Sequence, residues 1–338
     1  MMNFTLFVGY LSVLLLALLG ITTADADTRV VSEQPVIEIP LGAPISKPEA
    51  EISGMAWYGQ WLILLPQYPS TVGDHIYAIN KADITAFLDG RKKEPPALRS
   101  IDFDTRDLNA LPNYQGLEAI AFNGEDVYIT IETNRRSKIV GYLVSGDIAP
   151  DLSRLTMDNP RVVSIPTQAG VYNYGEESVL YFNGMVMTIH EVNGVNVNES
   201  PVIHRFDRQL DSLGTIPFPN IEYRITDATA PDNNGYFRAI NYFFHEDRDK
   251  LDPAPDSIVA KYGTGATHAR NPFVERLVEF QYTDQGVLLT DTAPIQLTLR
   301  DDGISRNWEG VVKLDKRGFL LVTDEHPGSI LAFVPAPQ

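Results

Sequence analysis

Five stretches of the chain share one pattern of polar and apolar positions. Each opens on a polar residue, continues through an apolar run, a turn and a second apolar run, and closes on another polar residue fourteen positions later. Glycine lies at or near every one of these turns. Such a pattern predicts antiparallel β-hairpins, with Asn-Gly at 123–124 and 183–184 as the strongest turn signals. The hairpins are expected at 53–67, 116–132 (where Glu118 is the opening polar residue), 177–191, 227–241 and 309–323.

Repeated hairpins without long helical periodicity predict an all-β fold, with a propeller or a sandwich as the natural class, and we expect the propeller. If the hairpins are arranged radially, their polar ends form two concentric rings on one face. The expected inner ring is Ser53, Glu118, Glu177, Asp227 and Glu309. The expected outer ring is Gln67, Glu132, Glu191, Asn241 and Thr323.

Apolar runs after each hairpin supply further strands, which in the fourth unit are expected at 257–262 and 274–282. Only one run, 329–334, follows the last hairpin. The strand-like segment 30–40 is therefore predicted to complete the last sheet, closing a five-bladed ring without free edges. A six-bladed ring is the alternative, because the interval before Glu309 holds two additional strand-like runs.

The first 26 residues resemble a cleaved secretory signal, with an apolar run to Ile21 followed by Ala24 and Ala26. One propeller domain, 27–338, would follow. No Lys or Arg precedes the apolar run, so an uncleaved membrane anchor is the alternative. With cleavage, we expect a secreted or periplasmic protein that has no membrane association.

The chain carries 27 basic and 44 acidic residues, for a formal net charge of −17, and this excess of acid disfavours nucleic-acid binding. It has no cysteine, so stability must come from the core, from ring closure or from a metal. We expect a monomer without a nucleic-acid partner.

Four carboxylates on one axis would repel one another, and a cation would remove this conflict. Oxygen ligands without cysteine favour Ca²⁺ over Zn²⁺. The predicted calcium ligands are the inner-ring residues Ser53, Glu118, Glu177, Asp227 and Glu309. The alternative is that each is an ordinary, separately solvated residue at a strand end.

The strand starts ISGMAW, LEAIAF, ESVLYF and WEGVVK resemble those of the soluble calcium-activated nucleotidases, or apyrases. This resemblance implies a five-bladed propeller with a central Ca²⁺ held by Ser53, Glu118, Glu177 and Glu309. Asp227 departs from the family pattern, which would have serine there. The stretch 307–333 is also similar to the last blade of the esterase-like domain of the phytase family, a secreted propeller group.

The candidate catalytic residues are Glu132 in the outer ring, Arg135 close after it, and His326 in a turn on the same face. Arginines on the ring-face loops could grip phosphate, because guanidinium binds phosphate through two hydrogen bonds. His190 is expected to pack away from the ring, and no serine-hydrolase motif is present. These arginines are Arg106, Arg135, Arg136, Arg224 and Arg306.

Together these features predict a calcium-dependent hydrolase that acts on a small anionic phosphoester or phosphoanhydride. The alternative is a non-enzymatic binding propeller whose calcium is structural.

Overall fold

The computed structural model describes residues 30–103, 108, 111–135, 138–157, 162–172 and 174–337, without the side chains at 135 and 138. The predicted signal at 1–26 lies outside these residues, as do Arg106 and Arg136. None of the helices in this part of the chain is long and apolar enough to cross a membrane.

The first two hairpins belong to one large sheet, because a short strand joins their outer edges. That strand, β10, pairs in parallel with β6 and antiparallel with β9. The first half of the sheet is β3 (Ile52–Tyr58), β4 (Trp61–Pro66), β5 (His75–Asn80) and β6 (Leu98–Phe103). The second half is β7 (Tyr114–Asn123), β8 (Asp126–Arg135), β9 (Lys138–Ile148), β10 (Arg154–Thr156) and β11 (Val163–Ile165).

Three further sheets follow in chain order. The first of them is β12 (Glu176–Phe182), β13 (Met185–His190), β14 (Val202–Phe206) and β15 (Ser212–Pro217). The next is β16 (Arg224–Ala228), β17 (Tyr236–Phe243), β19 (Val274–Thr283) and β20 (Gly286–Leu289), with β21 (Ile295–Gln296) beside β19. The last is β22 (Trp308–Leu314), β23 (Gly318–Thr323), β24 (Leu331–Pro335) and β2 (Ile37–Ile39).

Short helices and one two-stranded sheet lie outside the larger sheets. The pair is β1 (Val30–Val31) with β18 (Thr264–Gly265). The α-helices with described bounds are α1 (Lys81–Leu88), α3 (Arg248–Leu251) and α4 (Ser257–Tyr262). The 3-10 turns are η1 (Pro48–Ala50), η2 (Pro69–Val72), η3 (His245–Asp247) and η4 (His268–Arg270).

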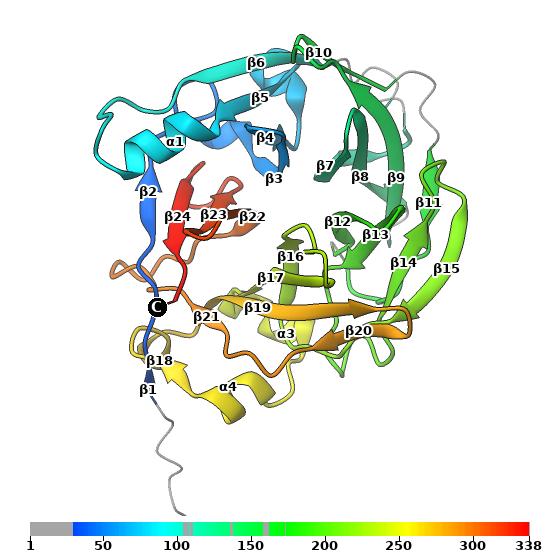
Figure 1. Ribbon diagram of the computed structural model, residues 1–338. Coiled ribbons are helices and arrows are strands. Elements are labelled where there is room, and N and C mark those ends of the chain that lie inside the picture. The colour runs from blue at the N-terminus through cyan, green and yellow to red at the C-terminus, as the bar shows by residue number, and fades with distance from the viewer. Residues whose placement is uncertain are drawn as a thin grey trace, which may run out of the picture.

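The sheets form a nearly closed ring, as expected of a β-propeller, with β3, β7, β12, β16 and β22 innermost (Figure 1). Residues from all of these strands line one apolar cavity of about 130 Å³ at the centre, which confirms that the hairpins converge. The segment 257–262 is the helix α4, so its prediction as a strand was wrong. The Asp256 side chain caps this helix by accepting hydrogen bonds from the backbone N–H groups of Ile258 and Val259.

A β-bulge interrupts the inner strand of every hairpin in the described chain, at the residue that opens the repeat. The register shifts at Ser53, Glu118, Glu177, Thr226–Asp227 and Glu309. A bulge places an extra residue opposite one partner and changes the direction of its side chain. The side chain of each opening residue therefore need not follow the alternation of inward and outward side chains in the rest of its strand.

Part of the N-terminal segment 30–40 closes the last sheet against 329–334, as predicted, whereas residues 30–31 of that segment pair with β18 instead. Strand β2 pairs antiparallel with β24, with Ile37 opposite Phe333 and Ile39 opposite Leu331. Ile39 is 2% exposed and packs in the core, whereas Ile37 in the same strand is 44% exposed.

This difference gives a matched test of closure. Ile39→Ala should lower the free energy of unfolding by about 2–5 kcal/mol, because it removes buried methyl groups and leaves a cavity. Ile37→Ala should change it by no more than about 0.5 kcal/mol. Urea denaturation measures both. Equal small losses would mean that β2 adds little to the stability of the ring.

Candidate functional site

Five glutamates converge at one end of the central channel. Glu118 lies on β7, Glu132 on β8, Glu177 on β12 and Glu309 on β22, and Glu191 directly follows β13. All five are buried, and repulsion from at least one other member raises the pKa of Glu118, Glu132, Glu177 and Glu309. The cluster therefore combines three residues of the predicted inner ring with two of the outer ring. We call these five residues the central cluster.

A single guanidinium, from Arg224 at the start of β16, joins two members of the central cluster. Its Nε donates to Glu191 Oε1, and its Nη2 donates to Glu309 Oε1 at 3.0 Å. Its Nη1 donates to the side chain of Asn307 at 2.9 Å. Among the described residues, Arg224 is the one cation that forms an ion pair with the cluster.

Burial is the main cause of the perturbed acidities in the cluster. It raises the pKa of Glu118 and Glu177 well above the usual range, and repulsion from other carboxylates adds to the rise. It also raises the pKa of Glu132 to about 8, where repulsion from Glu191 adds and Arg224 opposes. Burial raises the pKa of Glu191, and the contact with Arg224 opposes that rise. At neutral pH the cluster therefore holds protons, and Arg224 opposes protonation of Glu191 and Glu309, the two carboxylates that it contacts.

The Glu132 carboxylate is positioned by steric packing more than by hydrogen bonds. Its Oε1 is buried without a hydrogen-bond partner in the described chain, as are Glu191 Oε2 and Glu309 Oε2. Gly175 faces this oxygen so closely that a Cβ at that position would clash with it. Glu118 differs, because its Oε1 accepts a hydrogen bond from the Gln67 side chain at 3.3 Å.

Ser53 and Asp227 are turned toward the backbone instead of toward the cluster. The Ser53 hydroxyl donates to the carbonyl of Leu65 at 3.3 Å. The Asp227 Oδ2 accepts from the backbone N–H of Val311 at 2.7 Å and so connects β16 with β22. Within the described ranges, no group of three or more His, Asp or Glu side chains is arranged to hold a metal ion.

Tyrosines border the central cluster. Burial, followed by the charge of Glu118, raises the pKa of Tyr68 to about 12. The Arg224 guanidinium lies 5.3 Å from the ring centre of Tyr242 and 5.8 Å from that of Tyr174. The cluster therefore lies between aromatic faces, and such faces provide apolar contact surface next to the polar groups.

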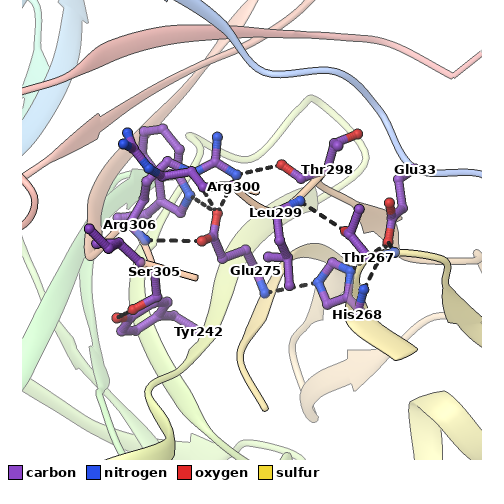
Figure 2. A network of polar contacts seen from close by, with 12 residues as sticks. Glu33, Tyr242, Thr267, His268, Glu275, Thr298, Leu299, Arg300, Ser305 and Arg306 are labelled. Carbon is purple, nitrogen blue, oxygen red and sulfur yellow. Dashed lines mark hydrogen bonds and ion pairs between the residues drawn. The ribbon is translucent and has the colours of Figure 1, made fainter. Parts of the chain in front are cut away.

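Arg306, predicted as a possible phosphate contact, is buried in a structural network. Figure 2 shows its guanidinium turned toward Glu275, with Nε 2.9 Å from Glu275 Oε2. The indole of Trp308 donates to the same oxygen at 2.8 Å. This network fixes the loop that leads into β22 and thereby positions Glu309.

The other two predicted catalytic residues, Arg135 and His326, are not seen to contact the central cluster in the described part of the chain. Arg135 ends β8, and its side chain is not described. The His326 side chain is 72% exposed, with Nδ1 3.7 Å from Glu325 Oε2. It lies beside Asp324, whose pKa burial raises and His326 helps to lower.

Sequence reasoning missed the residues that hold Arg224 in place. Asn307 accepts from Arg224 and donates to Asp324 Oδ2 at 2.8 Å. Asn307 lies two positions before Glu309, and Asp324 directly follows Thr323, so both residues flank the ends of the last hairpin. That proximity is the signal that could have identified them.

No family model matches the chain, and no curated protein matches it. Solved structures do match over most of its length. The α-L-arabinanase of Cellvibrio cellulosa, complexed with arabinohexaose, has 12% identity and a TM-score of 0.44, with 85% of this chain and 92% of that chain covered. The catalytic domain of the Coprinopsis cinerea GH62 α-L-arabinofuranosidase has 6% identity and a TM-score of 0.46. The match covers 90% of this chain and 96% of that chain.

A bifunctional GH43-CE protein of Bacteroides eggerthii matches 89% of this chain with 11% identity and a TM-score of 0.47. This chain spans only 34% of the length of that protein. Similarities of this extent are too distant to transfer an activity.

These findings correct the predicted family and function. These matched structures are an arabinanase, an arabinofuranosidase and a GH43-CE protein, and not apyrases or phytases, so the predicted resemblance to those two families was wrong. The short strand-start matches reflect the hairpin pattern itself, which unrelated propellers can share. The predicted calcium-dependent phosphoester hydrolase is wrong as well, and the calcium-binding propeller without activity gains no support. The site gives a physical reason, because Arg224 and Arg306 are already paired with carboxylates.

Proposed function

We propose that the protein is an exported, five-bladed β-propeller whose central cluster hydrolyses glycosidic bonds by acid–base catalysis. Five inner strands, each opening one hairpin unit, support the blade number. The additional runs considered for a sixth blade belong to the fourth hairpin's sheet, as β20 and β21. Export rests on the predicted signal at 1–26. A monomer without a nucleic-acid partner stays a prediction.

One observation carries the proposed chemistry: five buried glutamates converge near one guanidinium, which pairs with two of them. The ionised carboxylates of such a site repel an anionic phosphate group and stabilise positive charge. Glycosidic cleavage proceeds through an oxocarbenium-like transition state, which is positively charged, and it requires one carboxylic acid and one carboxylate. A buried cluster of protonated and ionised glutamates supplies both, so a neutral sugar replaces the anionic substrate predicted from the sequence.

The two roles follow from the environments of Glu132 and Glu191. With a pKa of about 8, Glu132 is protonated at neutral pH and can donate its proton to the leaving oxygen. Glu191 contacts Arg224, which favours its ionised form, so it can activate water or stabilise the cationic centre. Burial raises the pKa of both groups, but the direct contact with Arg224 opposes this rise at Glu191, and such a difference in environment assigns the acid to Glu132 and the base to Glu191.

A screen with chromogenic substrates tests this proposal. We expect the purified protein to release nitrophenol from at least one neutral glycoside, beginning with the arabinofuranoside, and none from nitrophenyl phosphate. An arabinan should be included, since the matched Cellvibrio enzyme is named for that substrate class. Release from the phosphate ester alone would overturn the proposal.

Calcium at the central cluster stays a prediction. Partnerless oxygens of Glu132, Glu191 and Glu309 are donors that Ca²⁺ prefers, but Ser53 and Asp227 would have to leave their backbone partners. As the side chains lie, no metal-binding group forms in the described chain, so we assign no catalytic step to a cation.

The melting temperature with EDTA and with added CaCl₂ tests this prediction. An ion at a hundred times its dissociation constant should stabilise the fold by about 2.7 kcal/mol. Equal melting temperatures would exclude such a site.

A further inference from the structure

A second polar recess lies outside the ring centre, beside the fourth hairpin's sheet. It is a cavity of about 200 Å³ next to the ends of β17 and β19, and α3, α4 and the turn before Val274 contribute to its walls. Figure 1 shows α4 and β18 on the outer side of β19. None of the residues that line the recess belongs to the central cluster.

Arg276 on β19 is the buried cation of this recess, with an exposed fraction of 2%. Its Nη1 lies 2.9 Å from Asp256 Oδ2, and its Nε donates to the side chain of Asn241 at 2.8 Å. Its Nη2 has no hydrogen-bond partner in the described chain. Leaving a buried charged donor unsatisfied is costly, so a partner for this nitrogen would be stabilising.

A second cation lies at the mouth. Arg248 on α3 is exposed, lies 5.3 Å from the ring centre of Phe243, and forms no ion pair within the described residues. Both ring nitrogens of His268 are occupied, because Nε2 accepts the backbone N–H of Glu275 at 3.2 Å and Nδ1 lies 2.9 Å from Glu33 Oε1 (Figure 2). The lining thus carries two guanidinium groups and one carboxylate, although the whole chain is strongly acidic.

The walls indicate what kind of anion fits. Tyr223, Phe243 and Phe273 line the recess with aromatic surface. A cavity of about 150 Å³ is enough to hold one benzene ring. We propose that this recess binds a small monocarboxylate that carries a ring, with the ring against these aromatic side chains and the carboxylate between Arg276 and Arg248.

Isothermal titration calorimetry with benzoate tests the proposal, with benzyl alcohol and inorganic phosphate as comparison probes. We expect one benzoate per chain, and weaker binding by at least about tenfold for benzyl alcohol, which lacks the charge. Arg248→Gln should weaken benzoate by a similar factor, and Arg270→Gln, an exposed arginine outside the recess, should leave it unchanged.

Two further results keep the test decisive. Arg276→Gln also removes one hydrogen-bond partner each from Asp256 and Asn241 and can unfold the region, so Val259→Trp serves as the second variant. It fills the recess from α4 and should abolish binding. Equal binding of benzoate and benzyl alcohol, binding of phosphate alone, or full binding by Val259→Trp would each overturn the proposal. Because the recess and the central cluster share no residue, these outcomes are independent of glycosidase activity.

Discussion

Replacing Arg224 with methionine should lower the free energy of unfolding by roughly 3–5 kcal/mol at neutral pH, because the change leaves buried carboxylates without their cation. Arg224 contacts Glu191 and Glu309 directly, and both are buried. Methionine keeps much of the side-chain volume, so the loss is mainly electrostatic. Urea denaturation at several pH values measures it.

The pH dependence of this loss has a defined sign. Burial raises the folded-state pKa of Glu191 and Glu309 above their unfolded values, and Arg224 opposes the rise. Such groups contribute stability that is present at low pH and is lost as the pH rises through the folded pKa. Without Arg224 that decline steepens, so the difference between variant and wild type should grow from pH 4 to pH 8.

Arg208→Met provides the control for this experiment. Arg208 is 52% exposed and pairs with Asp126 on the surface, so its loss should cost no more than about 1 kcal/mol. Equal losses in the two variants, or a loss at Arg224 that does not vary with pH, would show that the guanidinium does not hold the cluster together.

The hairpins and the closing strand were predictable because their signals are local. Apolar runs around an Asn-Gly turn indicate a hairpin from a few neighbouring residues, and the missing strand of the last unit required a partner such as 30–40. The β-bulges have no comparable sequence signature, because the extra residue in a bulged strand has no residue type that distinguishes it from its neighbours. They nevertheless decide which side chains enter the centre. At Glu118 and Glu177 the side chain reaches the cluster, whereas Ser53 and Asp227 bond to nearby backbone instead.

The arginines could not be assigned from sequence for a related reason. Arg224 meets Glu191 across 33 positions and Glu309 across 85, so its partners depend on the closure of the whole ring. Arg306 similarly meets Glu275 from the preceding sheet. A sequence shows that these cations lie near strand ends on one face, but not which carboxylates are close enough to pair with them. Substrate contact and internal pairing therefore remained equally compatible with the pattern.

Replacing Glu132 with glutamine should reduce kcat toward a glycoside substrate by about 10²- to 10⁴-fold, the contribution expected of a general acid. The fold should persist, because glutamine resembles the protonated acid in shape and Glu132 Oε1 has no hydrogen-bond partner to lose within the described chain. Glu94→Gln, an exposed change far from the cluster in sequence, should leave kcat unchanged. Initial rates and a melting curve for each variant separate lost chemistry from lost folding.

The pH profile tests the same assignment without a mutation. A general acid must carry its proton, so kcat of the wild type should fall as the pH rises past about 8, the pKa of Glu132. Gly175→Ala should shift this alkaline limb, because the added methyl group displaces the Glu132 carboxylate without changing its chemistry. If Glu132→Gln retains the wild-type rate, or if the alkaline limb stays fixed in Gly175→Ala, the proton comes from another member of the cluster. Glu118 and Glu177, whose pKa values burial raises well above the usual range, would then be the donors to test.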